Sequence, residues 1–122
     1  MRAEATIYVG DLAGMRAFYA ECFGLSITDG GPGYCGLSSA AWLVTLVQSH
    51  EALPATMPPP RRGDTPVKLG FEVPSIEELR RIAARLGGHV SPADAEWEFR
   101  NAVRCDCLDP EGNVVQLVQQ GG

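Results

Sequence analysis

The sequence predicts an α+β fold of two βαβββ modules, which form curved mixed sheets with the helices on the outer face. The pattern of apolar residues and helix-ending glycines in the first half of the chain returns in the second half. The chain closes with a turn at Asp109–Asn113 and a β-branched run after it, which predicts a final strand. We expect one domain over residues 1–122, with modules at 1–50 and 67–122 and a Pro-rich linker at 51–66.

The first module is predicted from its alternating and helical apolar patterns. Residues 4–9 alternate as a strand does, and Asp11 is placed to cap a helix whose apolar stripe runs from Leu12 to Cys22. Gly24 ends this helix. Further strands are expected at 25–28, 34–38 and 42–48, with a loop at 29–33.

The linker and the second module follow. Prolines between Leu53 and Pro66 exclude a helix or a sheet ladder, so we expect a slack linker, with a segment folded over a ligand as the alternative. Ser75 and Glu78 form a capping box, and Gly87-Gly88 ends the helix that it opens. The expected strands are 67–73, 89–91, 99–108 and the run after the final turn. A loop at 92–98 is expected between the second and third of these strands.

The repeat predicts which strand faces meet the helices. Val9 aligns with Val73, and Gly24 aligns with Gly88. Ile7 and Phe71 are then counterparts on the helix side, while the opposite faces line the hollow of the curled sheets. The hollow is predicted to carry Glu4, Thr6, Tyr8, Thr45, Lys68, Glu72 and Gln116.

Composition excludes several classes of partner. The net charge of -5 argues against nucleic acid, and no apolar run approaches the roughly 18 residues of a membrane-spanning helix. The N-terminal residues lack the apolar core of a secretory signal, so we expect a cytoplasmic protein. Its cysteines, including Cys105 and Cys107 on one side of a strand, are then reduced structural thiols.

The repeat, the first helix with Phe18-Tyr19 and Phe23-Gly24-Leu25, and the run from Asp109 to Leu117 together resemble the vicinal oxygen chelate superfamily. This superfamily includes glyoxalase I, extradiol dioxygenases and bleomycin-resistance proteins. The resemblance covers nearly the whole chain and implies the glyoxalase/bleomycin resistance fold.

The resemblance also places the superfamily's metal ligands, usually His or Glu, at four positions. This sequence has Glu4, Thr45, Lys68 and Gln116 there. Because an ammonium has no lone pair and repels a cation, Lys68 argues against a divalent metal. We expect no cofactor. The chain therefore resembles the metal-free, bleomycin-resistance-like branch, whose members bind bulky, partly aromatic molecules as homodimers.

We therefore expect a pocket for an aromatic small molecule. The predicted ligand-binding residues are Glu4, Tyr8, Thr45, Lys68, Trp97, Phe99, Arg104 and Gln116. Trp97 and Phe99 are expected to stack on the ligand, and the alternative is that they pack in the core. Glu4 and Lys68 are expected to pair with each other or to contact the ligand. Arg104 and Asp106 should face Val118 and Gln116 across the last hairpin. Arg61-Arg62 is expected to be a solvated loop pair.

The sequence favours a protein that confers antibiotic resistance by sequestering an aromatic antibiotic or natural product. No His, carboxylate and Ser or Cys residues have a spacing that indicates a catalytic triad. A metal-free isomerase or cyclase, with Glu4 as base and Lys68 as oxyanion stabiliser, is the alternative. A metal enzyme with a rearranged ligand set is a third.

Overall fold

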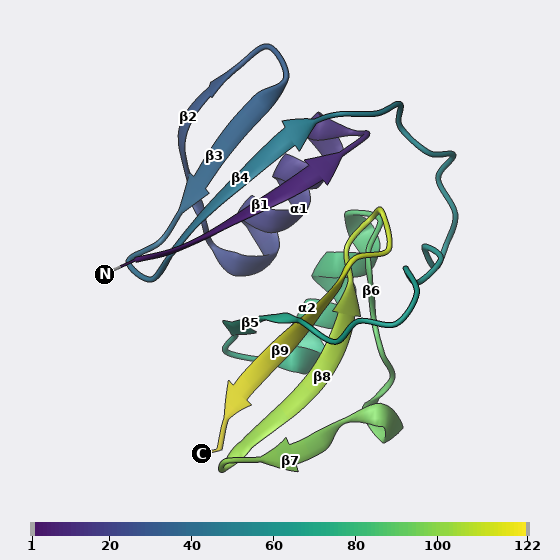
Figure 1. Cartoon of the computed structure of the whole chain (residues 1–122). Coiled ribbons are helices and arrows are strands. Elements are labelled where there is room, and N and C mark those ends of the chain that lie inside the picture. Colours follow the sequence, from purple (N-terminus) through teal and green to yellow (C-terminus); the bar gives the residue numbers. More distant parts are fainter. Residues whose placement is uncertain (1, 122) are drawn as a thin grey trace. The chain divides into compact units, whose positions relative to one another are not determined.

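The computed structural model of the chain describes residues 2–121 and separates into two compact units, Met1–Pro54 and Ala55–Gly122. Each unit is a sheet with a helix on one of its faces (Figure 1). This is the α+β arrangement of two helix-and-sheet modules that the sequence predicts. Neither α-helix in residues 2–121 has the length and apolar character needed to cross a membrane.

The first unit follows the βαβββ order. Its sheet has the strand order β1-β4-β3-β2, with β1 parallel to β4 and the other pairs antiparallel. The elements are β1 (Ala3–Val9), α1 (Leu12–Phe23), β2 (Ser26–Gly31), β3 (Tyr34–Ser38) and β4 (Trp42–Gln48).

Helix α1 begins and ends where the sequence predicts. The Asp11 side chain accepts a hydrogen bond from the Gly14 N–H at 3.0 Å, and Gly24 closes the helix with φ 64. The helix buries Met15, Phe18, Tyr19 and Cys22 on the side that packs against β3 and β4. Tyr8 and Thr45 therefore lie on the opposite face of the sheet.

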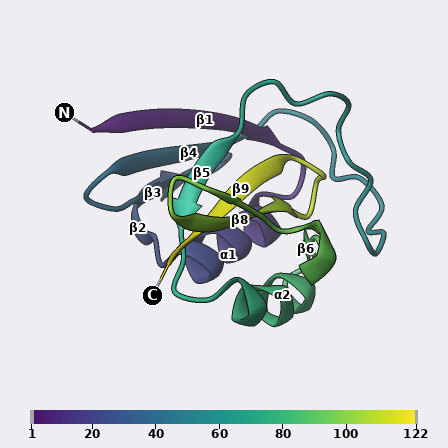
Figure 2. The ribbon, with the colours of Figure 1, turned by 90° about the horizontal axis from the view of Figure 1, so that it is seen from below.

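The second unit repeats the plan with an added short hairpin strand. Its sheet has the order β5-β9-β8-β6, and β7 also pairs with β8 (Figure 1). Figure 2 shows α2 on one side of β8 and β9. The elements are β5 (Leu69–Glu72), α2 (Ile76–Arg85), β6 (His89–Val90), the 3-10 helix η1 (Ala93–Ala95), β7 (Trp97–Phe99), β8 (Ala102–Leu108) and β9 (Val114–Gln120). Ser75 caps α2 by accepting from the Glu78 N–H at 3.1 Å.

The last turn is held from inside by one carboxylate. Asp109 is fully buried, and its Oδ1 accepts from the backbone N–H groups of Glu111 at 2.9 Å and Asn113 at 3.0 Å. Its Oδ2 accepts from Asn113 Nδ2 at 2.9 Å. Gly112 has φ 85, and a Cβ there would overlap the carbonyl oxygen of Pro60. Glycine is thus required both for the backbone conformation and for the close approach of the linker.

Part of the linker is packed, where the sequence predicted slack. Pro59 is buried, and the Arg62 N–H donates to the Gly112 carbonyl at 3.0 Å. The Arg62 Nε donates to the carbonyl of Glu111, also at 3.0 Å. Residues 59–62 are therefore fixed against the turn between β8 and β9.

Several element boundaries differ from the predictions. β2 continues through Asp29 to Gly31, because a bulge between Ile27 and Asp29 keeps the glycine-rich run paired with β3. β5 is shorter than predicted and begins after Lys68.

The predicted strand 99–108 is in fact a hairpin. Arg100 and Asn101 have φ 53 and 59, so they form a tight turn that joins β7 to β8. Trp97 was predicted in a loop and lies on β7.

Candidate functional site

The open face of the second sheet is the side away from α2, and it carries most of the predicted site. Phe71, Cys105 and Leu117 are buried on the helix side. The residues that alternate with them face the other way. In register, Trp97 of β7 pairs with Arg104, Arg104 pairs with Val118, and Asp106 pairs with Gln116. This confirms the expected pairing of Arg104 and Asp106 across the last hairpin.

Lys68 lies at the centre of this cluster. Its Nζ donates to Asp106 Oδ1 at 2.9 Å and is 5.8 Å from the centroid of the Trp97 ring. Side-chain exposures of 24% for Lys68 and 18% for Asp106 show that the ion pair is largely shielded from water. Shielding strengthens the attraction relative to a surface pair, although the desolvation cost offsets part of it.

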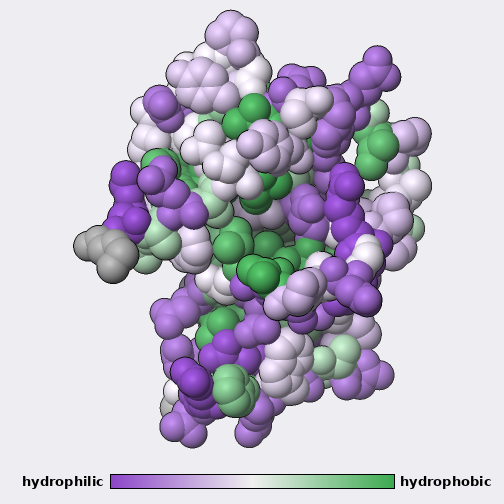
Figure 3. All heavy atoms as spheres, viewed as in Figure 1, coloured by the Kyte–Doolittle hydropathy of each residue, from purple (hydrophilic) through white to green (hydrophobic). Residues whose placement is uncertain are grey.

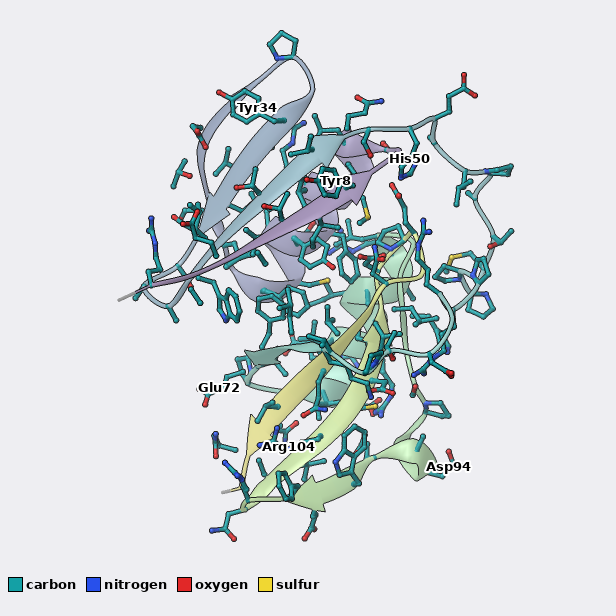
Figure 4. The ribbon with its side chains drawn as sticks, viewed as in Figure 1. Tyr8, Tyr34, His50, Glu72, Asp94 and Arg104 are labelled. Carbon is teal, nitrogen blue, oxygen red and sulfur yellow. The ribbon has the colours of Figure 1, made fainter. Side chains whose placement is uncertain are left out.

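Arg104 is held by neutral acceptors. Its guanidinium donates to Gln116 Oε1 at 2.7 Å and to the carbonyl of Phe99 at 3.3 Å. Its Cζ is 5.3 Å from the centroid of the Phe99 ring. Figure 4 shows Arg104 on β8, where the strand follows the β7 hairpin. Gln116 is therefore oriented by Arg104, and its carbonyl oxygen is already in use as an acceptor.

The aromatic residues of the site are exposed. The relative exposure is 37% for Trp97 and 54% for Phe99, so the alternative of core packing does not hold for either. Arg100 at the hairpin turn lies 5.2 Å from the Phe99 ring centroid. Figure 3 shows hydrophilic (purple) and pale side chains over β8 and β9, with small hydrophobic (green) patches among them. The open face is thus a mixed polar and aromatic surface.

Arg80 fixes the start of β7 from the helix side. It donates to the Ser91 carbonyl at 3.0 Å and forms ion pairs with Glu77 at 2.8 Å and with Glu96. The hydrogen bond that Arg80 donates to the Glu96 carboxylate is the main cause that raises the pKa of the Arg80 guanidinium. Because Glu96 directly precedes Trp97, this ion pair holds the strand that presents the indole.

Sequence reasoning missed the role of Arg61. Arg61 and Arg62 lie in a loop with side-chain exposures of 49% and 48%, as the prediction of a solvated loop pair expects. That prediction did not include their partners, because Arg61 lies 3.5 Å from Asp106 Oδ2 and donates to Thr65 at 3.2 Å. Arg62 is held by the final turn. No sequence signal relates a linker arginine to a strand carboxylate, whereas strand alternation did place Asp106 on the open face.

The other predicted residues belong to the first unit. Glu4, Tyr8 and Thr45 lie on the open face of its sheet, away from α1, where Tyr8 is 63% exposed. Figure 4 shows Tyr8 on β1 and Tyr34 on β3, which both flank Val47 in register. The expected pairing of Glu4 with Lys68 joins the two units and stays a prediction. Within its own unit, Lys68 is paired with Asp106.

The sequence from residue 3 to residue 117 matches the family model described as the Glyoxalase/Bleomycin resistance protein/Dioxygenase superfamily. The chain belongs to this superfamily. A search of curated proteins finds no match.

Solved structures of superfamily-like proteins share the fold. A family enzyme from Burkholderia phytofirmans PsJN is 20% identical, with a TM-score of 0.71 over 95% of both chains. A glyoxalase/bleomycin resistance protein from Albidiferax ferrireducens T118 is 18% identical, with a TM-score of 0.67 over 98% of both chains. Lactoylglutathione lyase from Agrobacterium tumefaciens is 22% identical, with a TM-score of 0.61 over 98% of this chain and 92% of that one. At these identities the likeness establishes the superfamily fold, and the function has to be argued from the site.

Proposed function

We propose that this superfamily member is a small-molecule binding protein that sequesters an aromatic antibiotic or natural product. The observation that supports this most strongly is the exposed Trp97 ring on the open face, next to the Lys68–Asp106 ion pair. Flat aromatic ligands stack on such rings, and the neighbouring polar groups give orientation.

The donor set of the second unit does not fit a divalent metal ion. At the two positions where the resemblance places ligands, Lys68 is a cation bound to Asp106, and the Gln116 oxygen accepts from Arg104. A metal there would meet two positive side chains within the same cluster, and Coulomb repulsion disfavours that arrangement. These residues support a metal-free site, in keeping with the bleomycin-resistance-like branch.

Calorimetric titration tests the proposal. Purified protein is titrated with a panel of bleomycin-type glycopeptides, enediynes and other aromatic antibiotics, and at least one of them should bind. The Trp97→Leu variant keeps an apolar side chain but removes the stacking surface, so it should bind roughly tenfold more weakly. Asp94→Ala, an exposed change on η1 shortly before Trp97, is the matched control and should bind as the parent does. Turnover of a substrate without binding across the panel would refute the proposal.

A metal-free isomerase or cyclase is the second candidate. Its support is the exposed Glu4 carboxylate on the open face of β1, together with the naming of two structural relatives as an enzyme and a lyase. The Glu4→Gln variant separates the candidates, because a binding protein should lose only modest affinity while an enzyme should lose most of its turnover.

Assembly and location are part of the proposal. The homodimer expected from the resemblance, with pockets built from both subunits, stays a prediction that light scattering of the purified protein checks. The cytoplasmic location also stays a prediction.

A further inference from the structure

We infer that the ligand of the open face of the second sheet is an anion, namely a planar aromatic molecule that carries a carboxylate. The inference rests on the proposed function and adds the charge of the ligand to it. It follows from the balance of charges on this face, the position of the aromatic rings and the space beside them.

Positive charge exceeds negative charge in this cluster. Arg61 and Lys68 share the single carboxylate of Asp106, at 3.5 Å and 2.9 Å. Arg104 adds a further cation, and among the ion pairs of residues 2–121 none involves it. Its partners, Gln116 Oε1 and the Phe99 carbonyl, are neutral. The whole chain has a net charge of -5, so this local excess runs against the composition.

The other carboxylate on this face lies apart from Arg104. Glu72 accepts from Gln120 at 2.9 Å, and in register it is separated from Arg104 by Val118 of β9. Two strand spacings amount to roughly 10 Å, about one Debye length at physiological salt, so Glu72 only weakly offsets the charge of Arg104.

The aromatic rings and the cations are placed to act on one ligand. Trp97 and Arg104 are direct register partners on neighbouring strands. The Lys68 ammonium lies 5.8 Å from the Trp97 ring centroid. The Arg104 guanidinium lies over the neighbouring Phe99 ring, 5.3 Å from its centroid. A flat molecule that stacks on the exposed part of the indole therefore lies beside both cations. A guanidinium binds a carboxylate through two parallel N–H donors, which makes this anion the best match for Arg104.

Gly70 leaves room beside the cluster. It pairs in register with Gln116. A Cβ built on Gly70 would meet nothing nearer than the backbone carbonyl oxygen of Gln116, at 4.0 Å. The edge strand thus presents bare backbone between Lys68 and Glu72 on this face. A ligand can approach the Gln116 side chain there without displacing another side chain.

Probes that share one ring system and carry an anionic, a neutral or a cationic substituent test the inference. The protein is titrated by calorimetry with anthraquinone-2-carboxylate, its neutral carboxamide and the cationic 2-(aminomethyl)anthraquinone. The acid should bind about tenfold more tightly than the amide, because a charge-assisted hydrogen bond is stronger than a neutral one. The amine should bind most weakly, and the preference for the acid should shrink as salt rises from about 0.05 to 0.5 M.

The outcomes separate the two proposals. If the amide or the amine binds as tightly as the acid, the inference about charge is overturned while small-molecule binding stands. If none of the probes and no member of the antibiotic panel binds, the proposed function itself fails.

Two substitutions of opposite expected sign sharpen the test. Arg104→Met should weaken acid binding about tenfold and leave amide binding nearly unchanged. Asp106→Asn should strengthen acid binding several-fold, because it removes the repelling carboxylate and releases two cations. Arg81→Met makes the same chemical change on the exposed side of α2 and should alter neither.

Contrary results are equally defined. Equal losses for acid and amide in Arg104→Met, in a variant that melts as Arg81→Met does, would show a steric role and overturn the inference. Weaker acid binding in Asp106→Asn would do the same. Gly70→Val, which fills the space beside Gln116, should weaken both probes, and unchanged binding in this variant would place the ligand elsewhere.

Discussion

Replacing Asp109 by alanine removes the group that holds the turn between β8 and β9. Its carboxylate accepts hydrogen bonds from the Glu111 and Asn113 N–H groups and from Asn113 Nδ2, at 2.9, 3.0 and 2.9 Å. Each bond to a charged acceptor is worth about 1.5–3 kcal/mol, and a buried donor left unpaired costs about 1–3 kcal/mol. Because the three bonds share one carboxylate whose desolvation is also relieved, the losses do not add. We expect the free energy of unfolding to fall by about 3 kcal/mol.

Urea unfolding followed by circular dichroism measures this loss. With an m value of about 1.5 kcal/mol/M, the midpoint should fall by about 2 M. Asp109→Asn keeps Oδ1 but turns an amide nitrogen toward Asn113 Nδ2, so it should lose about half as much. Asp94→Ala changes an exposed aspartate and should stay within about 0.5 kcal/mol of the parent. If the Asp109→Ala midpoint lies within about 0.3 M of that control, the carboxylate does not hold the turn.

Two further predictions concern the backbone and the thiols. Gly112→Ala should lower the free energy of unfolding by about 2 kcal/mol, because φ at this residue is 85° and the new Cβ meets the Pro60 carbonyl. The control Gly70→Ala should change the free energy of unfolding by less than about 0.5 kcal/mol. Equal urea midpoints for the two variants would contradict this prediction. Burial raises the pKa of the Cys35 and Cys105 thiols above the ordinary 9.0. The unfolded chain thus loses protons that the folded protein keeps, so stability that is complete below pH 9.0 should fall as pH rises beyond it. Cys105→Ala should reduce this slope in denaturant titrations at different pH, and an unchanged slope would be the contrary result.

The helix ends were predicted correctly, because capping residues have one main structural role. Asp11 and Gly24 marked the ends of α1, and Ser75 marked the start of α2. Each is required by unpaired backbone groups at a helix end, and this requirement does not depend on tertiary context. Period-two alternation likewise placed Arg104 and Asp106 opposite the correct partners on β9.

The hairpin at Arg100-Asn101 shows what such signals miss. The turn needs φ > 0 at both residues, and an Asn-Gly or Asp-Gly pair would have predicted it. Arginine at the first position gives no such signal, so the run from Phe99 read as one strand. The error placed Trp97 in a loop, although it still placed the indole near the site.

The partners of the charged residues depend on tertiary structure. The sequence identified Lys68 and Asp106 as candidates for the same face, but Lys68 was matched to Glu4 through the repeat. In the second unit, Asp106 forms ion pairs with both Lys68 and the linker residue Arg61. The linker reaches Asp106 because residues 59–62 are bound to the final turn. That contact involves backbone carbonyls, which carry no signature in the sequence.

These contacts connect the unfavourable metal chemistry to the proposed ligand. A bound metal ion and a pair of protein cations are alternative means of holding an anionic oxygen of a ligand, since both supply positive charge at a fixed place. In the proposed site Lys68 and Arg104 supply that charge, with Lys68 bound to Asp106 and Arg104 bound to Gln116. In this proposal the lysine at position 68 disfavours a metal ion and favours a carboxylate for the same reason, its positive charge. A site of this kind should keep its affinity for the anionic probe in the presence of excess chelator, and loss of affinity on chelation would show that an ion is needed after all.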